Sequence, residues 1–371
     1  MEMLRVGLIG TGFMGKCHAL AWASVRAVFG DVPPIRLACL AETNGELARR
    51  RADTLGFERA FGDWRALVAD PAVDVVSVTT PNHLHAEMAV AALEAGKHVW
   101  CEKPMATSLE AASRMLAAAH ESGKVAILGY NYVQNPAVRK MAALVADGAV
   151  GFITHVRVEM DEDFMADPNT PFSLRSDARS GYGALDDFGV HALSLLWAMV
   201  GPVKRVIAHM AMPYPTRPLA QGTDRKVETH DIATLLVEMR NGASGLIALN
   251  RAAWGRKGRI AVQIFGSRGS ISFDQERMNE IRVFQASAPA SDQGYATILM
   301  GPAHPPYGNF IPAPGHQLGF NDLKVIECRQ LIGRIRGEKS SCIGFEEGFA
   351  IEKAVHAAAE SFKKTAWVDI D

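Results

Sequence analysis

Residues 4–22 read LRVGLIGTGFMGKCHALAW, and this stretch decides the fold of the first part of the chain. An apolar strand over residues 4–9 runs into Gly10, Gly12 and Gly15, and a helix follows. Glycines at this G-x-G-x-x-G spacing permit a tight turn, a close approach of backbone to a pyrophosphate, and close packing of helix against strand. The helix N-terminus adds N–H donors and partial positive charge. The pattern predicts a dinucleotide phosphate loop, although glycines in such a turn can also serve backbone geometry alone. The predicted cofactor contacts of this loop are Gly10, Thr11, Gly12, Phe13, Met14 and Gly15.

Beyond the loop, short Val/Ile/Leu/Ala-rich runs alternate with helical periodicity as far as about residue 129. This alternation is typical of a parallel sheet with helices on both faces. Gly96 and Gly123 are expected to end helices in the left-handed conformation, and Thr107 with Glu110 matches the Ser/Thr-x-x-Glu capping box that starts one. The strands are expected at residues 4–9, 35–41, 59–61, 74–79, 98–101 and 125–128.

An acidic residue, Glu42, follows the second expected strand. An acid at this place can accept hydrogen bonds from both hydroxyls of the adenosine ribose, which favours NAD over NADP. The run Arg49, Arg50, Arg51 could instead meet a 2′-phosphate, but on helical spacing we interpret it as a solvated face. We therefore expect NAD as the cofactor.

Two polar clusters follow successive strands of this region, TTPNHLHAE at residues 79–87 and AGKHVWCEKP at residues 95–104. Ligands of open α/β sheets bind at the edge where parallel strands end. His83 and His85 fall near the first turn of a helix, where they can also be capping or surface groups. Lys103, just past a buried strand, is placed to touch a substrate oxygen as a cation; the other reading is a structural partner of a nearby carboxylate.

In this order and spacing, IGTGFMG, TTPNHLHAE and AGKHVWCEKP resemble the Gfo/Idh/MocA family of NAD(P)-dependent sugar and polyol oxidoreductases. The resemblance continues in GYGALDDFGVHALSLL at residues 181–196, which is similar to the family's D-x-G-x-H segment, and in AAAESFKKTAWVDI, which is similar to its closing helix and strand. It implies that Lys103 contacts the reacting hydroxyl and that Asp187 and His191 complete the catalytic set. Further cofactor contacts are expected from Thr80, Pro81, Asn82, His85, Glu102, Lys103 and Asn131, and substrate contacts from Lys103, Asn131, Asp187 and His191.

The spacing of Asp187 and His191 supports this interpretation independently of the resemblance. Residues four apart on a helix project from one face, one turn apart. The helix is expected to stop at Gly201-Pro202. Histidine suits proton exchange near neutral pH, although a lone histidine on an apolar helix is more often a core residue.

After residue 129 the pattern changes to longer strands joined by tight turns. Residues 230–240 and 243–250 are interpreted as a hairpin closed by a two-residue Asn241-Gly242 turn. Further strands are expected at residues 151–160, 203–210, 260–264, 271–273 and 281–284. The fold class is thus an α/β Rossmann domain with a doubly wound parallel sheet, residues 1–130, and an α+β domain with a large, mainly antiparallel sheet, residues 131–371. The second sheet is expected to carry helices on one face. The resemblance implies that its open face joins subunits in a homodimer or homotetramer.

Two departures from the family pattern concern substrate specificity. Many members carry an arginine before an N-x-P motif where this chain has Val133 and Gln134, and an acid where it has Ser194. Other polar groups could meet sugar hydroxyls, each with a surface or turn role as the alternative. These candidates are Asn131, the acidic cluster at residues 160–164, His230, His304 and His316.

The composition excludes several classes of partner. The chain has 371 residues, 48% of them hydrophobic, and 39 basic against 40 acidic residues, for a net charge of -1. Near neutrality gives no general attraction to nucleic acid or to an anionic membrane surface, and neither is expected as a partner. The apolar runs are too short to cross a bilayer, and the N-terminus shows no export signal. Five scattered cysteines predict no disulfide framework and favour a cytoplasmic location; no metal site is expected.

The predicted reaction is hydride transfer between a nicotinamide and a carbinol or ketone of a cyclic polyol or sugar, such as an inositol, hexose or anhydrosugar. In this hypothesis His191 exchanges the hydroxyl proton, Lys103 holds the oxygen, and Asp187 orients one of them. Two alternatives stay open at this point. One is an NAD-dependent glycosidase on the same scaffold, and the other is a non-catalytic dinucleotide-binding regulatory protein.

Overall fold

The computed structural model describes residues 3–219 and 222–370, which form two compact units. The N-terminal unit takes in residues 1–134 and 318–349, and the C-terminal unit takes in residues 135–317 and 350–371. The first division, after Gln134, lies close to the boundary expected at residue 130. The sequence analysis placed all of residues 131–371 in one domain, whereas residues 318–349 cluster with the first unit because a helix there packs against the helix of the glycine loop.

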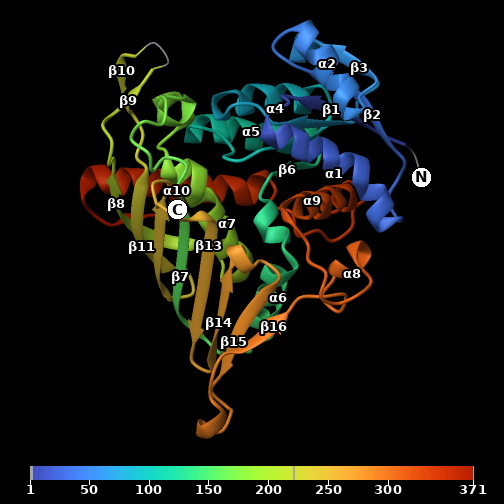
Figure 1. The fold of residues 1–371 in the computed structure, drawn as a ribbon. Helices are drawn as coiled ribbons and strands as arrows, with labels where there is room; N and C mark the ends of the chain where they lie inside the picture. The colour runs from blue at the N-terminus through green and yellow to red at the C-terminus, as the bar shows by residue number, and fades with distance from the viewer. Residues whose placement is uncertain (1–2, 220–221, 371) are drawn as a thin grey trace. The chain divides into compact units, whose positions relative to one another are not determined.

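A six-stranded parallel sheet forms the centre of the N-terminal unit, in the order β3-β2-β1-β4-β5-β6 (Figure 1). The strand order reverses between β1 and β4. Right-handed crossovers then place the helices of the two halves on opposite faces of the sheet. This confirms the doubly wound Rossmann architecture and the six expected strands. The strands are β1 (Leu4–Ile9), β2 (Ile35–Ala41), β3 (Arg59–Phe61), β4 (Val75–Val78), β5 (His98–Cys101) and β6 (Ala126–Leu128).

Several helices of this unit begin or end at residues with identifiable capping chemistry. The expected left-handed glycines are confirmed, with φ of 72° at Gly96 and 61° at Gly123. The prediction of a capping box at Thr107 was wrong by one residue. Ser108 is the N-cap, and its side chain accepts a hydrogen bond from the Ala111 amide. The helices are α1 (Phe13–Phe29), α2 (Gly45–Leu55), α3 (Trp64–Val68), α4 (His85–Glu94), α5 (Leu109–Ser122) and α9 (Phe320–Ile335), with short 3₁₀ turns at Asn82–Leu84 and Asn131–Gln134.

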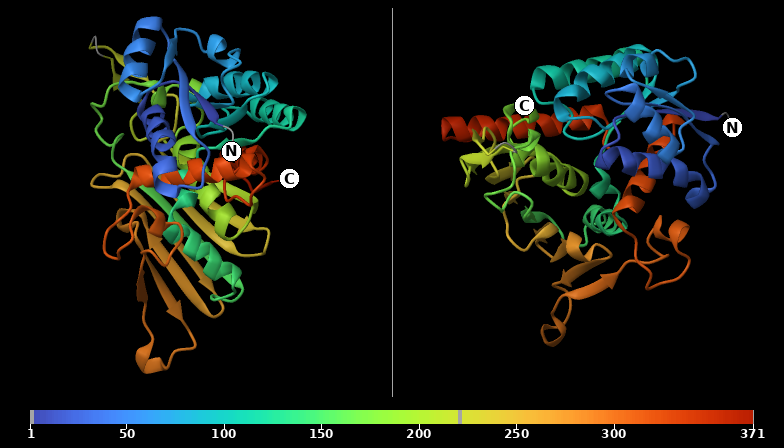
Figure 2. Two further views of the ribbon diagram at one scale, coloured as in Figure 1. Left: turned by 90° about the vertical axis from the view of Figure 1, so that its right-hand side faces the viewer. Right: turned by 45° about the horizontal axis from the view of Figure 1, so that its top comes forward.

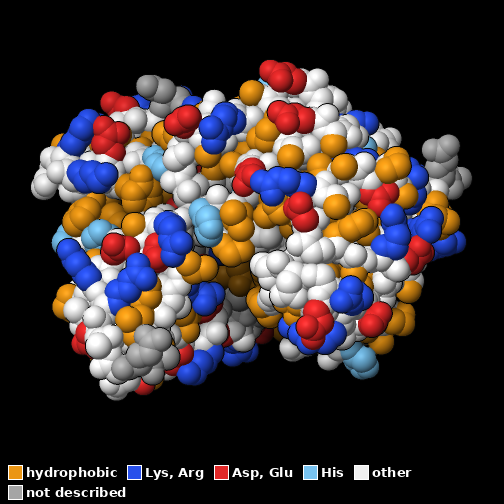
Figure 3. All heavy atoms as spheres, turned by 90° about the horizontal axis from the view of Figure 1, so that it is seen from above, with side chains coloured by type: hydrophobic (Ala, Val, Ile, Leu, Met, Phe, Trp, Pro, Cys, Tyr) orange, Lys and Arg blue, Asp and Glu red, His pale blue; other side chains and the backbone are white. Residues whose placement is uncertain are grey.

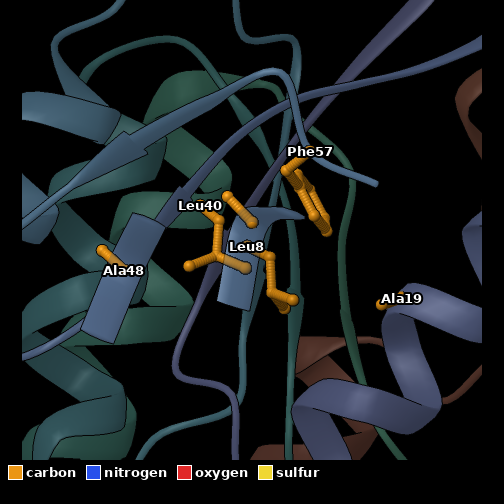
Figure 4. Close-up of a cluster of buried hydrophobic side chains, with 6 residues drawn as sticks. Leu8, Ala19, Leu40, Ala48 and Phe57 are labelled. Atoms are coloured by element: carbon orange, nitrogen blue, oxygen red, sulfur yellow. The ribbon is translucent and has the colours of Figure 1, made fainter. Parts of the chain in front are cut away.

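An apolar cluster joins the first two strands to α1 and α2 (Figure 4). Leu8 on β1 and Leu40 on β2 are both fully buried, and Phe57 closes the cluster after α2. Ala19 and Ala48 contribute only methyl groups, which lets their helices approach the sheet closely. This packing holds α1 against the sheet and so fixes where the glycine loop lies.

Helix α9 packs against α1, so two segments about 300 positions apart in the sequence lie side by side (Figure 1). At the start of the two helices the Phe13 and Phe320 rings stack at 5.8 Å between centroids. Near the other end of α1, Arg329 of α9 bonds Asp31, with 2.6 Å between Nη2 and Oδ2. The sequence analysis assigned no role to this helix.

A nine-stranded mixed sheet dominates the C-terminal unit, in the order β16-β15-β14-β13-β7-β12-β11-β8-β17. All its pairings are antiparallel except that between β7 and β12, which confirms a large, mainly antiparallel sheet. The strands are β7 (Ile153–Glu162), β8 (Val203–Ala211), β11 (Ile232–Met239), β12 (Ser244–Asn250), β13 (Lys257–Gly266), β14 (Gly269–Asp274), β15 (Glu280–Gln285), β16 (Ala296–Leu299) and β17 (Val368–Asp369). A separate ribbon pairs β9 (Thr216–Pro218) with β10 (Asp224–Lys226).

The hairpin between β11 and β12 is present, but its loop differs from the predicted two-residue turn. The Met239 amide donates to the Ala243 carbonyl, so three residues, 240–242, close the hairpin. Gly242 takes a φ of 89°, and the Asn241 side chain accepts from the Ala243 amide. A three-residue loop ending in a left-handed residue is the next commonest solution after the two-residue turn.

Helices lie on one face of this sheet. Helix α6 (Pro136–Ala146) contacts β14 and β15 and runs along the strands (Figure 2), and α7 (Val190–Met199) contacts β7. On β11 the buried residues Ala233, Leu235 and Val237 alternate with Thr234 and Leu236, which are exposed. Alternation of this kind places buried and exposed side chains on opposite faces. One covered face and one open face are therefore confirmed.

Residues 301–316 contain one short helix, α8 (Tyr307–Phe310), and are otherwise irregular. The last helix, α10 (Phe345–Lys364), leads to β17. None of the helices within the described ranges is long and apolar enough to cross a bilayer. Basic and acidic side chains are interspersed on the face drawn in Figure 3.

Candidate active site

The glycine loop connects β1 to α1 and is shaped by close backbone contacts. Gly10 has a φ of 87°, and a Cβ there would lie 2.8 Å from the Thr79 carbonyl oxygen. A Cβ at Gly15 would collide with the Gly10 carbonyl oxygen, because α1 starts directly against the loop. Thr79, which follows β4, donates its hydroxyl to that same oxygen at 2.8 Å. The loop is thus held against the end of β4, at the point where the strand order reverses.

Gly12 differs from the other two glycines of the loop. It is the N-cap of α1, and a Cβ built on it would meet nothing within 4 Å. The first amides of α1 have no partner within the helix and point out of its N-terminus. Open space beside a helix N-terminus is what a pyrophosphate needs for close approach.

Glu42, directly after β2, reaches across to the same loop. Its Oε1 accepts from the Thr11 amide at 2.7 Å and also from the Thr11 hydroxyl, and its Oε2 accepts from the Thr43 amide at 3.1 Å. The carboxylate is therefore fixed beside the phosphate loop, where ribose hydroxyls can donate to it. The three arginines at residues 49–51 are exposed on α2, and Arg50 pairs with Glu46 one turn away.

Two observations show that the N-terminal unit can accommodate a dinucleotide. One is the cradle at Gly12, which a side chain would fill. The other is Asn131, which is 2% exposed and whose Nδ2 has no hydrogen-bond partner among the described residues. A buried amide donor without a partner is costly, so a ligand acceptor at Asn131 would satisfy it. The residues present fit NAD.

His85 opens α4 and is 1% exposed. Its ring nitrogens lie 2.8 Å from the Pro104 carbonyl oxygen and 2.9 Å from the Thr80 carbonyl oxygen. Burial lowers the pKa of this imidazole, which favours the neutral ring. His85 thus ties together the segments that follow β4 and β5, while Pro81 and His83 beside it are exposed and Asn82 is half-buried.

Lys103 follows β5 and is partly exposed, whereas its neighbour Glu102 is 4% exposed. The Glu102 carboxylate accepts from the Lys103 amide at 3.4 Å and from Lys324 of α9 at 2.5 Å, and it contacts His18 of α1 at 2.8 Å. A Cβ on Gly129, just past β6, would collide with this carboxylate. Glu102, expected to contact the cofactor, therefore lies beneath the segment that carries Lys103.

Asp187 and His191 lie on one continuous helical segment of the C-terminal unit. The backbone is a π-helical turn over Leu185–Gly189 and continues as α7, so Asp187 is in the turn and His191 is at the start of the α-helix. His191 is 6% exposed, and the Asp187 side chain is 23% exposed. Wide π-turns recur at functional sites because they redirect side chains.

Two arginines flank the Asp187 carboxylate. Its Oδ2 lies 3.7 Å from Nε of Arg175 and 3.7 Å from Nη1 of Arg251. Arg251 is buried and donates to Asp231 at 2.7 Å, while the Arg175 side chain is 62% exposed and lies over the Phe164 ring. Positive charge on both sides favours the ionised carboxylate of Asp187.

The adjacent carboxyl, Asp186, is in the opposite environment. It is 2% exposed and accepts from the Tyr182 amide, and its Oδ1 has no partner among the described residues. Burial raises the pKa of Asp186 to about 7, with the charge of Asp187 adding to the shift and Arg251 opposing it. The two neighbouring acids thus differ in environment, with Asp186 buried and Asp187 beside two arginines.

Among the further candidates for substrate contact, the acidic cluster and His304 have side-chain partners, whereas His230 and His316 are bonded through their backbones. Asp161 and Asp163 of the acidic cluster bond Arg259 and Lys257 of β13. The His230 backbone bridges to Gly183. The remaining two lie in the irregular segment before α9: His304 Nδ1 accepts from the Gly301 amide, and the His316 carbonyl accepts from Tyr307.

The residues at which the chain departs from the family pattern are buried or hydrogen-bonded within the protein. Gln134 is 1% exposed and exchanges hydrogen bonds with Ser341, at 3.2 Å from its amide nitrogen and 3.0 Å to its amide oxygen. The Ser194 hydroxyl donates to the His191 carbonyl at 2.8 Å, within the helix. Val133 is buried.

Five residues that the structure places around the candidate groups were not predicted from the sequence. A signal existed for Lys324 and Glu327, which form an i, i+3 charged pair among the apolar residues of α9. Arg251 follows an alternating strand, and neither its position nor that of Arg175 separates it from an ordinary surface arginine. The fifth is His18, which stands on the buried side of α1.

A doubly wound sheet with this glycine loop, a carboxylate fixed beside the loop and a lysine at the end of a strand is typical of an NAD-dependent oxidoreductase. Comparison with known families agrees. Residues 4–130 match the model of an oxidoreductase family with an NAD-binding Rossmann fold, and residues 138–272 match the GFO/IDH/MocA C-terminal domain. The chain belongs to the Gfo/Idh/MocA family.

Two named dehydrogenases are similar to this chain, one of them over its whole length. It is 38% identical to levoglucosan dehydrogenase of Pseudarthrobacter phenanthrenivorans, over 100% of this chain and 99% of the relative. A structure of levoglucosan dehydrogenase in complex with NADH and L-sorbose has a TM-score of 0.97 at 37% identity and full coverage of both chains. Myo-inositol 2-dehydrogenase of Thermotoga maritima is 28% identical over 74% of this chain and 76% of the relative.

Proposed function

We propose that this protein is an NAD-dependent dehydrogenase that acts on a carbinol of a sugar or cyclic polyol. The observation that carries the proposal is the pairing of a fixed NAD-type ribose carboxylate, Glu42, with a Lys103 segment and an Asp187–His191 helix in one chain. A binding-only regulatory protein has no need of such a lysine, acid and histidine set. The Asp187 carboxylate has an arginine on each side, Arg175 and Arg251, and their positive charge suits an acid that acts as an anion.

The relatives support the substrate class. Levoglucosan dehydrogenase has been solved with NADH and levoglucosan at a TM-score of 0.96 and 37% identity over the whole of both chains. Its ligands, levoglucosan and L-sorbose, are uncharged polyhydroxylated molecules. We therefore place anhydrosugars and hexoses first among the candidate substrates of this chain, and inositols second.

The proposed roles follow from side-chain chemistry. When bound, NAD supplies a nicotinamide carbon that accepts or donates a hydride. Lys103 holds the substrate oxygen and stabilises the negative charge that develops on it. His191 takes the hydroxyl proton during oxidation and returns it during ketone reduction. Asp187 orients the cationic partner, and Arg175 and Arg251 place positive charge beside its carboxylate.

A substrate panel tests the proposal directly. Levoglucosan, hexoses, inositols and alkyl glycosides are incubated with the protein and NAD⁺, and both NADH absorbance and released sugar are followed. Sugar-dependent NADH formation is the expected result. Sugar release from glycosides without net NADH would instead identify the glycosidase reaction, and no turnover with intact NADH binding would identify a regulatory protein.

Two substitutions test the catalytic set. Lys103→Met and His191→Ala are each expected to lower kcat by a factor of roughly 10² to 10⁴, because each removes a charge or proton transfer in the transition state. NADH affinity, measured by fluorescence titration, should stay within a few-fold of wild type. Wild-type turnover in both variants would overturn the assignment. Arg36→Gln, which breaks an exposed ion pair with Glu58, serves as a charge-removal control.

We also propose that the open face of the nine-stranded sheet joins copies of this chain into a dimer or tetramer. Leu236, on the face opposite the helices, is 51% exposed. Arg157 and Glu159 of β7 and Arg259 of β13 line a hollow on the C-terminal unit with both signs of charge, as a self-complementary interface requires.

A further inference from the structure

A buried cluster of charged and titratable groups lies beneath the segment that carries Lys103. The Glu102 carboxylate oxygen Oε1 lies 2.8 Å from His18 Nε2 and 2.5 Å from Lys324 Nζ. Lys324 also donates to Glu327 Oε2 at 2.8 Å. None of these four side chains is more than 5% exposed. The reaction proposed above uses none of them.

The cluster joins three elements of the N-terminal unit. His18 belongs to α1, the helix that starts at the glycine loop; Glu102 follows β5; Lys324 and Glu327 belong to α9. Trp100 of β5 fills the space between them. The His18 ring stacks on it at 3.7 Å between centroids, and Lys324 Nζ lies 5.3 Å from its centroid.

The charges are balanced around one strong ion pair. Burial opposes ionisation of Glu102, but the charge of Lys324 and the hydrogen bond with His18 outweigh it and lower the pKa of this carboxyl. Burial lowers the pKa of His18 to about 4, so the ring is neutral and donates from Nε2. Burial raises the pKa of Glu327 to about 7, and Lys324 opposes that rise.

Such a cluster is a poor source of stability. Removing charged groups from water costs about as much as their attraction returns, and well-packed apolar residues often serve equally well. The lack of a side chain at Gly129 also leaves room for the cluster, because any side chain there would collide with the Glu102 carboxylate. A costly buried ion pair is better explained by what it positions than by the stability it adds.

The positioned group is the segment at residues 102–104. While Oε1 of Glu102 is bound by His18 and Lys324, Oε2 accepts from the Lys103 amide at 3.4 Å. The Glu102 amide is bonded to the Val78 carbonyl of β4 at 2.9 Å. The carboxylate therefore links helices α1 and α9 to the backbone of Lys103.

We propose that Lys324, acting through Glu102 and supported by His18, is a positioning residue that fixes the backbone of Lys103 relative to the glycine-loop helix. The proposal rests on the function proposed for Lys103. It makes α9 part of the apparatus that aligns substrate oxygen and cofactor, although α9 itself contributes no group to the reaction. Alignment errors of about 1 Å can cost on the order of 10²-fold in rate.

Lys324→Met removes the cation while keeping a long apolar side chain. Hydrogen–deuterium exchange with peptide mass spectrometry on the full chain measures the amides of residues 101–106. The expected result is exchange at least about tenfold faster in this segment, with kcat lowered about 10- to 100-fold. NADH affinity should stay within threefold of wild type, so kcat falls while the KM for NAD⁺ stays close to the wild-type value.

Lys97→Met is the matched control. Lys97 is also buried in the N-terminal unit, where Nζ donates to the Asp70 carbonyl at 2.9 Å, but it precedes β5 and so lies at the opposite end of that strand from Glu102. This variant should lose thermal stability while exchange at residues 101–106 and kcat stay at wild-type values. Comparison of the Lys324→Met and Lys97→Met variants therefore distinguishes a positioning role from a general loss of stability.

A second variant covers the case in which Lys324→Met does not fold because Glu102 is left buried and unpaired. Glu102→Gln/Lys324→Met removes both charges together, and it should fold yet show the same fast exchange at residues 101–106. Wild-type exchange in this segment in either folded variant would overturn the proposal. Exchange requires no turnover, so a wild-type protein inactive on every sugar would overturn the proposed function alone.

Discussion

At the scale of single residues, the site separates side chains that share a chemical type. Asp186 and Asp187 are neighbours, but one is buried with a raised pKa and the other is flanked by two arginines. Pairs of acids whose environments differ in this way identify which one works as an anion and which is structural. The spacing to His191 distinguishes Asp187 in the sequence, but only the structure shows how differently the two carboxyls of ALDDFG are surrounded.

The raised pKa of Asp186 has a consequence for stability. Because its folded pKa of about 7 lies above the ordinary 3.8, the native state binds an extra proton between these values. The contribution of this group is therefore fully present below about pH 4 and is lost as the pH rises to 7. Linkage sets the slope at up to about 1.4 kcal/mol per pH unit.

Asp186→Asn should remove this pH dependence, since the amide stays neutral. Urea unfolding of both proteins between pH 5 and pH 8 measures it: the variant should gain stability relative to wild type as the pH rises. Asp224→Asn, at an exposed position, is the control and should follow wild type throughout. A constant difference between wild type and Asp186→Asn over this range would contradict the assignment.

At the scale of elements, two glycines of the glycine loop lack a side chain for different physical reasons. Gly15 is required by the fold, because α1 starts against the Gly10 carbonyl. Gly12 faces open space, so nothing within the protein requires its lack of a side chain. A side chain at Gly12 would instead occupy the space that a pyrophosphate needs for close approach to the helix N-terminus.

Alanine substitutions separate these two reasons. Gly12→Ala should leave the melting temperature of the apo protein within about 1 °C of wild type but weaken NADH binding at least about tenfold, because the methyl group occupies the cradle. Gly15→Ala should lower the melting temperature by several degrees, since the overlap with backbone costs about 1–3 kcal/mol. Fluorescence titration and thermal unfolding measure the two effects. Equal NADH affinity in Gly12→Ala and wild type would show that the pyrophosphate binds elsewhere.

Element boundaries followed the sequence where a local signal decided them. The six strands of the parallel sheet and the left-handed glycines at Gly96 and Gly123 needed only residue type and spacing. The capping box moved from Thr107 to Ser108 because either hydroxyl can cap and tertiary packing selects the register. The β11–β12 loop gained a third residue for the same reason, since the strand pairing fixes where the turn must close.

At the scale of the whole molecule, the sheet of the C-terminal unit exposes side chains on the face opposite α6 and α7. On β11, Thr234 and Leu236 are on this face, opposite the buried Leu235 and Val237. An exposed sheet face with apolar and charged side chains of both signs is suited to pairing with a copy of itself.

Light scattering coupled to size exclusion tests the proposed assembly. Wild type should have the mass of a dimer or tetramer, and Leu236→Glu should shift the mass toward the monomer because the charge is buried without a partner at the interface. Leu20→Glu, at a partly exposed position on α1, should keep the wild-type mass. A monomeric wild type would overturn the proposed interface.

The sequence by itself determined the two sheets, the phosphate loop, the acid at Glu42 and the candidate set of Lys103, Asp187 and His191, because each depends on residue type at a short spacing. Only the tertiary structure decided that α9 belongs to the N-terminal unit and that Glu102 lies buried against Lys324. It also decided that Arg251 lies behind Asp187. These contacts join residues about 60 to 300 positions apart. Charge pairing across such separations leaves no periodicity in a sequence, since it is the packing of whole elements that brings the charges together.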